Sequence, residues 1–212
     1  MPRQPYLPNF AHLDYAVGAD VLSNHDHLCA AIGKCIALWS GVENEVGNLF
    51  GILMGVNSAA TLELFSLLRR TSNQIEALTT MSKHALSDKD QELFDILIKK
   101  YKSLESERNS LAHGCFGVAS NDPDALLWIS IKDHVHFQTD ILSKMATGAS
   151  IDNPHQRLRE NMYVYKTTDL QSLYSEMQNF WRAIKDYNFY LRFPANSALS
   201  NTKLESRIRM LN

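Results

Sequence analysis

The chain has 212 residues, of which 45% are hydrophobic and 21% charged, a composition typical of a folded globular protein and not of a disordered chain. Its formal net charge of −2 at pH 7 excludes a protein that coats nucleic acid through a general basic excess. It does not exclude an enzyme that holds a few phosphates locally. The length predicts one domain, residues 1–212, with room for a substantial core.

The cysteines and the N-terminus predict the compartment. Cys29, Cys35 and Cys115 are odd in number and lack paired spacing, which favours a reducing environment over a disulfide framework. The first residues lack the apolar run of a signal peptide. The longest apolar stretch, near residues 49–56, is too short to span a bilayer. We therefore expect a soluble cytoplasmic protein without membrane association.

The first half of the chain reads as helical. Residues 1–20 contain three prolines and little periodicity, which predicts an irregular arm. Apolar residues at helical spacing predict a first helix from about Ser23 to about Gly55. A second helix is expected at residues 58–69.

Two capping signals and a glycine define the next two helices. Thr71 with Gln74 forms a capping box that predicts the start of a third helix, and Ser87 with Asp90 predicts the start of a fourth. Gly114 is expected to end the fourth helix as its C-terminal cap.

The apolar pattern then changes to a period of two. Residues 115–119 and 127–131 predict a hairpin around a turn at residues 121–124, and residues 162–165 could add a third strand. Residues 140–160 are polar and predict a loop.

A last helix is expected from Thr168, capped with Gln171, to Pro194, followed by a tail, residues 195–212, that could form a short basic helix. The elements together predict a mainly α fold. We expect an antiparallel four- or five-helix bundle with a small β-hairpin or sheet, residues 115–166, inserted after the fourth helix.

Residues 106–114, Ser-Glu-Arg-Asn-Ser-Leu-Ala-His-Gly, place a fixed cation, an amide and an imidazole at the predicted end of the fourth helix. Arg108 can hold a phosphate bidentately and stabilise the charge of a phosphorane-like transition state. His113 can take and return protons near neutral pH. Asn109 lies one turn before His113 and could orient the imidazole or donate to a phosphate oxygen. The alternative is a capped helix end with a structural arginine.

The spacing of Arg108 and His113 raises a geometric problem. Side chains five residues apart point about 140° apart on an ideal helix. Either the last turn unwinds or the arginine reaches across, or a second copy of the chain completes the site across a dimer axis. A dimer would supply two histidines, enough for separate acid and base roles.

Glu43 is a candidate supporting residue, because it falls within the apolar arc of the first helix, where a carboxylate needs a partner. One interpretation is that it positions Arg108. The other is a structural ion pair, or a carboxylate that reaches solvent at the bundle edge.

Other groups carry weaker signals. His25 with His27, and His134 with His136, have spacings that could bind a metal, but no cysteine or acidic cluster completes either site, so we expect no metal and no cofactor. The rings of Trp128 and Tyr163 could stack a base, with a core role as the alternative. Lysines 99, 100 and 102 could steer RNA or form a solvated helix face.

The run Arg108-Asn109-Ser110-Leu111-Ala112-His113 at the end of a long helix resembles the HEPN superfamily, whose hallmark is Arg, a polar residue, variable positions and His. The resemblance covers roughly residues 22–114 and 168–192 and implies a helical bundle. Many members are metal-independent endoribonucleases that act as dimers in toxin–antitoxin or phage-defence systems. It implies that Arg108 and His113 are catalytic and that Asn109 supports them.

The leading hypothesis is therefore an endoribonuclease that leaves a 2′,3′-cyclic phosphate. Its partners would be an RNA substrate, a second copy of the chain and an antitoxin protein. The alternative is a noncatalytic HEPN-like dimer that binds nucleotide or protein through the same residues. The β insertion and the net negative charge depart from the minimal family pattern.

Overall fold

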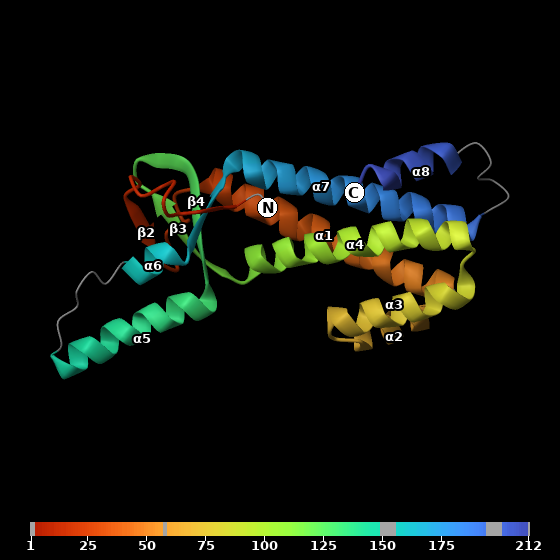
Figure 1. Ribbon diagram of the computed structural model, residues 1–212, viewed down its shortest axis with the longest axis horizontal. Coiled ribbons are helices and arrows are strands. Elements are labelled where there is room, and N and C mark those ends of the chain that lie inside the picture. The colour runs from red at the N-terminus through yellow and green to blue at the C-terminus, as the bar shows by residue number, and fades with distance from the viewer. Residues whose placement is uncertain (1–2, 57–58, 149–155, 194–200, 212) are drawn as a thin grey trace. The chain divides into compact units, whose positions relative to one another are not determined.

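The computed structural model describes residues 3–56, 59–148, 156–193 and 201–211. The chain forms two compact units, called unit 1 (residues 1–36 and 107–174) and unit 2 (residues 37–106 and 175–212). The described residues contain eight helices and five strands, so the fold is mainly α with a small sheet, as predicted (Figure 1). Among these residues, no helix has the length and apolar character needed to cross a membrane.

Unit 1 is built on an antiparallel sheet of five strands in the order β1-β5-β4-β3-β2. The predicted hairpin is present as β3 (Gly114–Ala119) and β4 (Asp122–Ser130), and β5 (Met162–Lys166) pairs with β4 on its other side.

The N-terminal residues differ from the expected irregular arm, because they supply both edge strands of this sheet. The two strands are β1 (Gln4–Pro5) and β2 (Tyr15–Val17), which pair with β5 and β3. A proline is tolerated here because an edge strand has one unpaired side. Between the strands, Tyr6 is fully buried and its hydroxyl donates to the carbonyl oxygen of Leu13 at 2.7 Å. Edge pairing and this buried ring order a segment that has no periodic pattern of its own.

One prediction within the β insertion is wrong. The second strand was expected to include Ile131 and to lead towards a loop, but β4 ends at Ser130 and α5 (Ile131–Thr147) follows directly. The reason is a capping box: the Ser130 hydroxyl accepts the Asp133 amide at 3.1 Å and donates to its carboxylate at 2.6 Å. Gly148, with φ of 68°, caps the other end in the left-handed conformation.

A short helix, α6 (Gln156–Glu160), also occupies the end of the expected loop. Residues 149–155, the middle of that prediction, lie outside the described residues.

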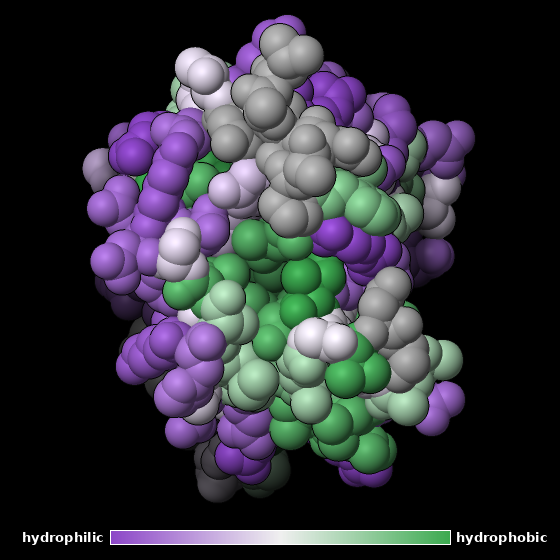
Figure 2. Space-filling view, turned by 90° about the vertical axis from the view of Figure 1, so that its right-hand side faces the viewer, coloured by the Kyte–Doolittle hydropathy of each residue, from purple (hydrophilic) through white to green (hydrophobic). Residues whose placement is uncertain are grey.

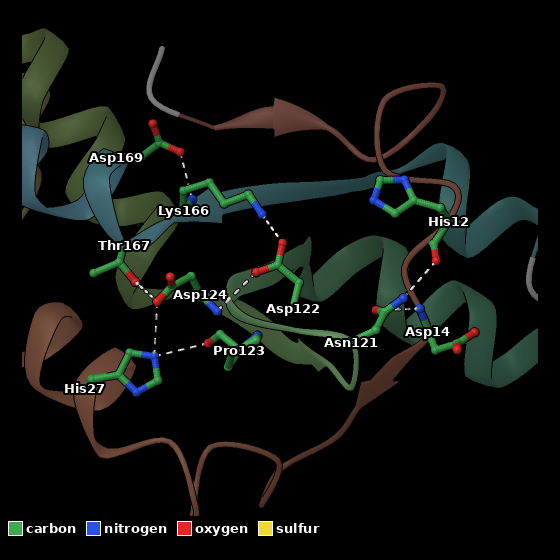
Figure 3. A network of polar contacts seen from close by, with 10 residues as sticks. All are labelled: His12, Asp14, His27, Asn121, Asp122, Pro123, Asp124, Lys166, Thr167 and Asp169. Carbon is green, nitrogen blue, oxygen red and sulfur yellow. Dashed lines mark hydrogen bonds and ion pairs between the residues drawn. The ribbon is translucent and has the colours of Figure 1, made fainter.

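Polar contacts tie the β3–β4 turn, meaning residues 120–124 and thus including the first residues of β4, to the start of α7 (Thr167–Arg192), as Figure 3 shows. Lys166 forms an ion pair with Asp122, and the Thr167 hydroxyl donates to Asp124 at 3.2 Å. The Asp169 carboxylate accepts the main-chain amide of Lys166 at 2.7 Å. Asp169 therefore caps α7, and the predicted capping box of Thr168 and Gln171 is not the one that forms.

The same turn also contacts α1 (Asp26–Leu53) and the N-terminal segment (Figure 3). Nε2 of His27 lies 3.1 Å from the carbonyl oxygen of Pro123. The Asn121 side chain donates to the carbonyl of His12 at 3.1 Å and accepts the amide of Asp14 at 3.2 Å. The turn therefore holds three segments that are distant in the sequence.

Unit 2 is helical in its described part. It contains α2 (Ala59–Leu67), α3 (Thr71–Ala85), α8 (Asn201–Arg209) and parts of α1, α4 (Asp88–Ala112) and α7. Aromatic rings stack in its core: the ring centres of Trp39 and Tyr101 are 5.4 Å apart, and those of Tyr101 and Phe180 are 6.1 Å apart. The Asn188 amide donates to the carbonyl of Glu45 at 2.9 Å, joining α7 to α1 inside this unit.

Two capping predictions in unit 2 have opposite outcomes. Ser87 and Asp90 form the expected box, since the serine hydroxyl accepts the Asp90 amide at 3.3 Å and donates to its carboxylate at 2.7 Å. At α3 the N-cap is Arg70, which makes no capping hydrogen bond with its side chain, so the predicted box of Thr71 and Gln74 is wrong. Thr71 is already inside the helix, one position too late to cap it.

Unit 2 also exposes several large apolar side chains, and Figure 2 shows a hydrophobic area on the side of the molecule that is on the right in Figure 1. Exposed apolar residues occur at and beyond the end of α1, on α2 and at the end of α7: Met54, Val56, Leu62, Leu64, Leu67, Phe189 and Phe193. Contiguous apolar surface is typical of a face that contacts another protein.

Removal of the Ser87 cap tests the energetics of unit 2. Ser87→Ala is expected to lower the free energy of unfolding by about 1 kcal/mol, because the Asp90 amide loses its acceptor at the start of α4. Urea unfolding followed by circular dichroism measures this. Ser103→Ala, at an exposed position inside the same helix, is the matched control and should be neutral or slightly stabilising. Equal effects of the two changes would contradict the role of the cap.

Candidate functional site

The Arg108-Asn109-x-x-x-His113 motif lies at the junction of α4 and β3, within unit 1. The last residue of α4 is Ala112, and His113 occupies a bend between this helix and the first residue of the strand. Its amide still donates to the carbonyl of Asn109 at 3.0 Å. Arg108 and Asn109 are half-buried, whereas His113 is exposed. The imidazole is thus accessible to a ligand, and the cation is partly withdrawn from water.

Asn109 contacts Arg108 directly. One terminal guanidinium nitrogen, Nη1, donates to the Asn109 side-chain oxygen at 2.9 Å. The Nε atom of Arg108 is buried and has no hydrogen-bond partner within the described part of the chain. This hydrogen bond allows Asn109 to orient the guanidinium of Arg108, whereas the sequence suggested that Asn109 could orient the imidazole of His113.

Trp128 on β4 fixes the end of α4, and sequence reasoning did not find this contact. Its indole Nε1 donates to the main-chain carbonyl of Ser110 at 2.7 Å. The last carbonyls of a helix have no partner inside the helix, so this bond satisfies one of them. Ser110 lies between Arg108 and His113, and the bond holds the turn that carries both.

Gly114 is required by the same tryptophan. A Cβ built on Gly114 would lie 1.8 Å from Nε1 of Trp128, a distance no side chain tolerates. The helix ends two residues before Gly114, close to the predicted stop, but Gly114 is not a left-handed cap, because in the described chain only Gly55 and Gly148 are glycines with positive φ. The chain passes directly from helix to strand, and the indole packs where a side chain would be.

The rings of Trp128 and Tyr163 have a structural role instead of an open stacking surface. The Arg3 guanidinium carbon lies 4.2 Å from the centre of the Trp128 ring and 5.0 Å from that of Tyr163. Trp128 is 7% exposed. A cation already occupies the ring faces, which favours the core role of this pair over base stacking.

Glu43 has a partner on its own helix. The Trp39 indole donates to the Glu43 carboxylate at 2.9 Å, one turn earlier along α1. Glu43 is exposed and belongs to unit 2, whereas Arg108 belongs to unit 1. The role of Glu43 in positioning Arg108 therefore stays a prediction.

The two histidine pairs, His25 with His27 and His134 with His136, are possible metal ligands by their spacing in the sequence. His27 faces the β3–β4 turn, where Nε2 also lies 3.8 Å from the Asp124 carboxylate. His134 and His136 are on α5, so their directions differ by about 200° and they do not share a face as they would on a strand. Among the described residues there is no group of three or more His, Cys, Asp or Glu side chains that could hold a metal ion.

Comparison with known proteins identifies no relative: no family model, no curated protein and no solved structure matches the chain.

Substitution of Gly114 tests how tightly the motif is held. Gly114→Ala should lower the free energy of unfolding by roughly 1–3 kcal/mol, because the new methyl group would overlap the Trp128 indole and force it from the Ser110 carbonyl. Thermal or urea unfolding measures the change. Gly33→Ala is the matched control in the same unit, since nothing lies within 4 Å of its Cβ position, and a gain of about 0.5–1 kcal/mol is expected in the α1 helix. A neutral Gly114→Ala would show that the indole is not packed there.

Proposed function

We propose that the chain is a metal-independent endoribonuclease of the HEPN type, with an antiparallel helical bundle as the family's scaffold. The observation that carries this proposal is the exposed His113 beside an arginine that Asn109 holds, at a helix end fixed by Trp128. A cation for phosphate charge and an imidazole for proton transfer are sufficient for RNA cleavage without a cofactor.

In the proposed reaction, the 2′-hydroxyl of the substrate attacks the adjacent phosphorus. The O2′–P bond forms, the P–O5′ bond breaks, and a 2′,3′-cyclic phosphate remains. The hydroxyl proton is lost to a base, and the departing 5′-oxygen receives a proton. His113 performs one of these transfers, while Arg108 stabilises the negative charge of the phosphorane.

The second proton-transfer group would come from His113 of a second copy of the chain. Burial of apolar surface would also favour a homodimer, because unit 2 exposes apolar residues on α2 and at the ends of α1 and α7. The proposed setting is the cytoplasm, in a toxin or phage-defence system where an antitoxin protein would be a further partner.

A basic hollow in unit 2 supports RNA as the substrate. It has a volume of about 960 Å³ and lies along α3 and α4, with Arg70, Lys83 and Lys102 among its lining residues. These three cations are exposed and form no ion pair within the described residues. Glu76 and Glu105 also line the hollow, so its positive charge is moderate. Local cations of this kind bind the phosphate backbone even when the whole chain is slightly acidic.

A noncatalytic, dimeric HEPN-like module that binds nucleotide or protein is the alternative. The observation that favours it is the half-buried state of Arg108 and its bond to Asn109, which are equally suited to a structural network. On this view the motif residues stabilise the helix end or an interface and never contact a scissile bond.

Cleavage of mixed RNA in EDTA separates the two functions. The wild-type protein should yield ends with cyclic phosphate, and His113→Ala should lower the rate by about 10²–10⁴-fold, the usual contribution of a proton-transfer group. Arg108→Ala should cause a comparable loss, because the phosphorane charge is no longer stabilised.

His84→Ala, at an exposed position on α3, is the matched control and should cleave like the wild type. Gel analysis and mass spectrometry of the RNA ends give the readout. Absence of cleavage, or cleavage that survives both motif substitutions, would refute the enzyme and leave the binding module.

A further inference from the structure

A small pocket adjoins the motif within unit 1. Its volume is about 290 Å³, and its lining includes Leu22, Gly114, Cys115, Phe116 and His134. These residues come from the segment before α1, from β3 and from α5. Gly114 follows His113 directly in the chain, so the two Cα atoms are about 3.8 Å apart across a trans peptide. The pocket is therefore bordered by the residue that directly follows the proposed proton-transfer residue.

The lining of the pocket selects the kind of group it can take. Its volume lies just below the roughly 300–1,000 Å³ range of ligand pockets, which suits one ring system and not an extended ligand. Leu22 and Phe116 give it apolar walls, and no lysine or arginine among the described residues lines it, so within this part of the chain a phosphate has no counter-charge there. The flat groups of Phe116 and His134 are of the kind on which unpaired RNA bases stack.

We propose that this pocket binds one nucleobase of the RNA substrate, next to the phosphodiester held at the motif. The inference rests on the proposed function and deepens it, since it assigns a subsite for base recognition. Phe116 and Leu22 supply the apolar contact, and the imidazole of His134 is the polar group that can bond to a base edge. His134 is a specificity residue of this subsite, and it comes from the α5 helix that the sequence pattern did not predict.

Cys115 provides a probe that does not require cleavage. Cys115 lines the pocket and is half-buried, and burial raises the pKa of its thiol, so alkylation is followed at alkaline pH, where more thiolate is present. A Cys29→Ser background removes the exposed cysteine. Cys35 is the internal reference, because it is buried and burial raises the pKa of its thiol to about 11.

The experiment measures N-ethylmaleimide labelling of Cys115 by mass spectrometry. The added ligands are dinucleotides with a 2′-O-methyl group, which cannot be cleaved because the attacking hydroxyl is blocked. A dinucleotide at ten times its dissociation constant should slow the labelling about tenfold. Different bases should give different degrees of protection, and His134→Ala should reduce these differences.

Two tryptophan substitutions control for indirect effects. Leu22→Trp fills the pocket and should abolish the protection by dinucleotides, whereas Val135→Trp, at an exposed position on α5, should leave it intact. Circular dichroism of both variants verifies that they fold. If Leu22→Trp does not fold, calorimetry of dinucleotide binding to Cys115→Ser provides a second test. The serine variant should still bind the dinucleotide.

Labelling of Cys115 at an unchanged rate with every dinucleotide would overturn the pocket, even if the protein cleaves RNA. Protection that persists in Leu22→Trp would overturn it as well. Conversely, protection that is lost in Leu22→Trp supports the subsite even when no cleavage occurs in EDTA. In that case only the ribonuclease function fails, and a base-binding module remains.

Discussion

The hydrogen bond from the Trp128 indole to the carbonyl of Ser110 is the contact on which the arrangement of the motif depends. It joins the last turn of α4 to a central strand of the sheet, and it is possible only because Gly114 has no side chain. A buried carbonyl without a partner costs about 1–3 kcal/mol, which is a large fraction of the stability of a typical domain. Arg108 and His113 are on either side of this anchored carbonyl, so their directions are set by the sheet as well as by the helix.

The anchor depends in turn on segments far away in the sequence. Arg3 lies over the ring of Trp128, and β1 and β2 from the same N-terminal segment close the two edges of the sheet. The β3–β4 turn is held by Lys166 and His27 through ion pairs and hydrogen bonds, most of them at least partly exposed. Exposed ion pairs contribute little individually, about 0–1 kcal/mol, so the buried strand contacts account for more of the order of unit 1. The N-terminal segment is thus a structural part of the candidate site.

The sequence predicted the features that have a local cause. The long helices follow from apolar spacing, the β3–β4 hairpin from alternation and a turn signal, and the Ser87 cap from two residues three apart. The features that were missed have distant or competing causes. The edge strands form by pairing with a sheet that does not yet exist locally, and α5 forms because the Ser130 cap outweighs the alternation that continues to Ile131. The contact of Trp128 with Ser110 spans 18 positions and joins a strand to a helix, so no local sequence pattern predicts it.

The burial of the motif residues bears on the chemistry that they can perform. Two unit charges at 4 Å interact by about 1 kcal/mol in water but by about 4 kcal/mol near a protein surface, so a half-buried Arg108 would hold a phosphate more strongly than an exposed one. Asn109 already restrains the guanidinium, which lowers the entropy lost on binding. A proton-transfer group has the opposite requirement, because it must reach both the substrate and solvent, and His113 is exposed. The bend after Ala112 separates these two environments within five residues, so the same helix end can supply a sheltered cation and an accessible imidazole.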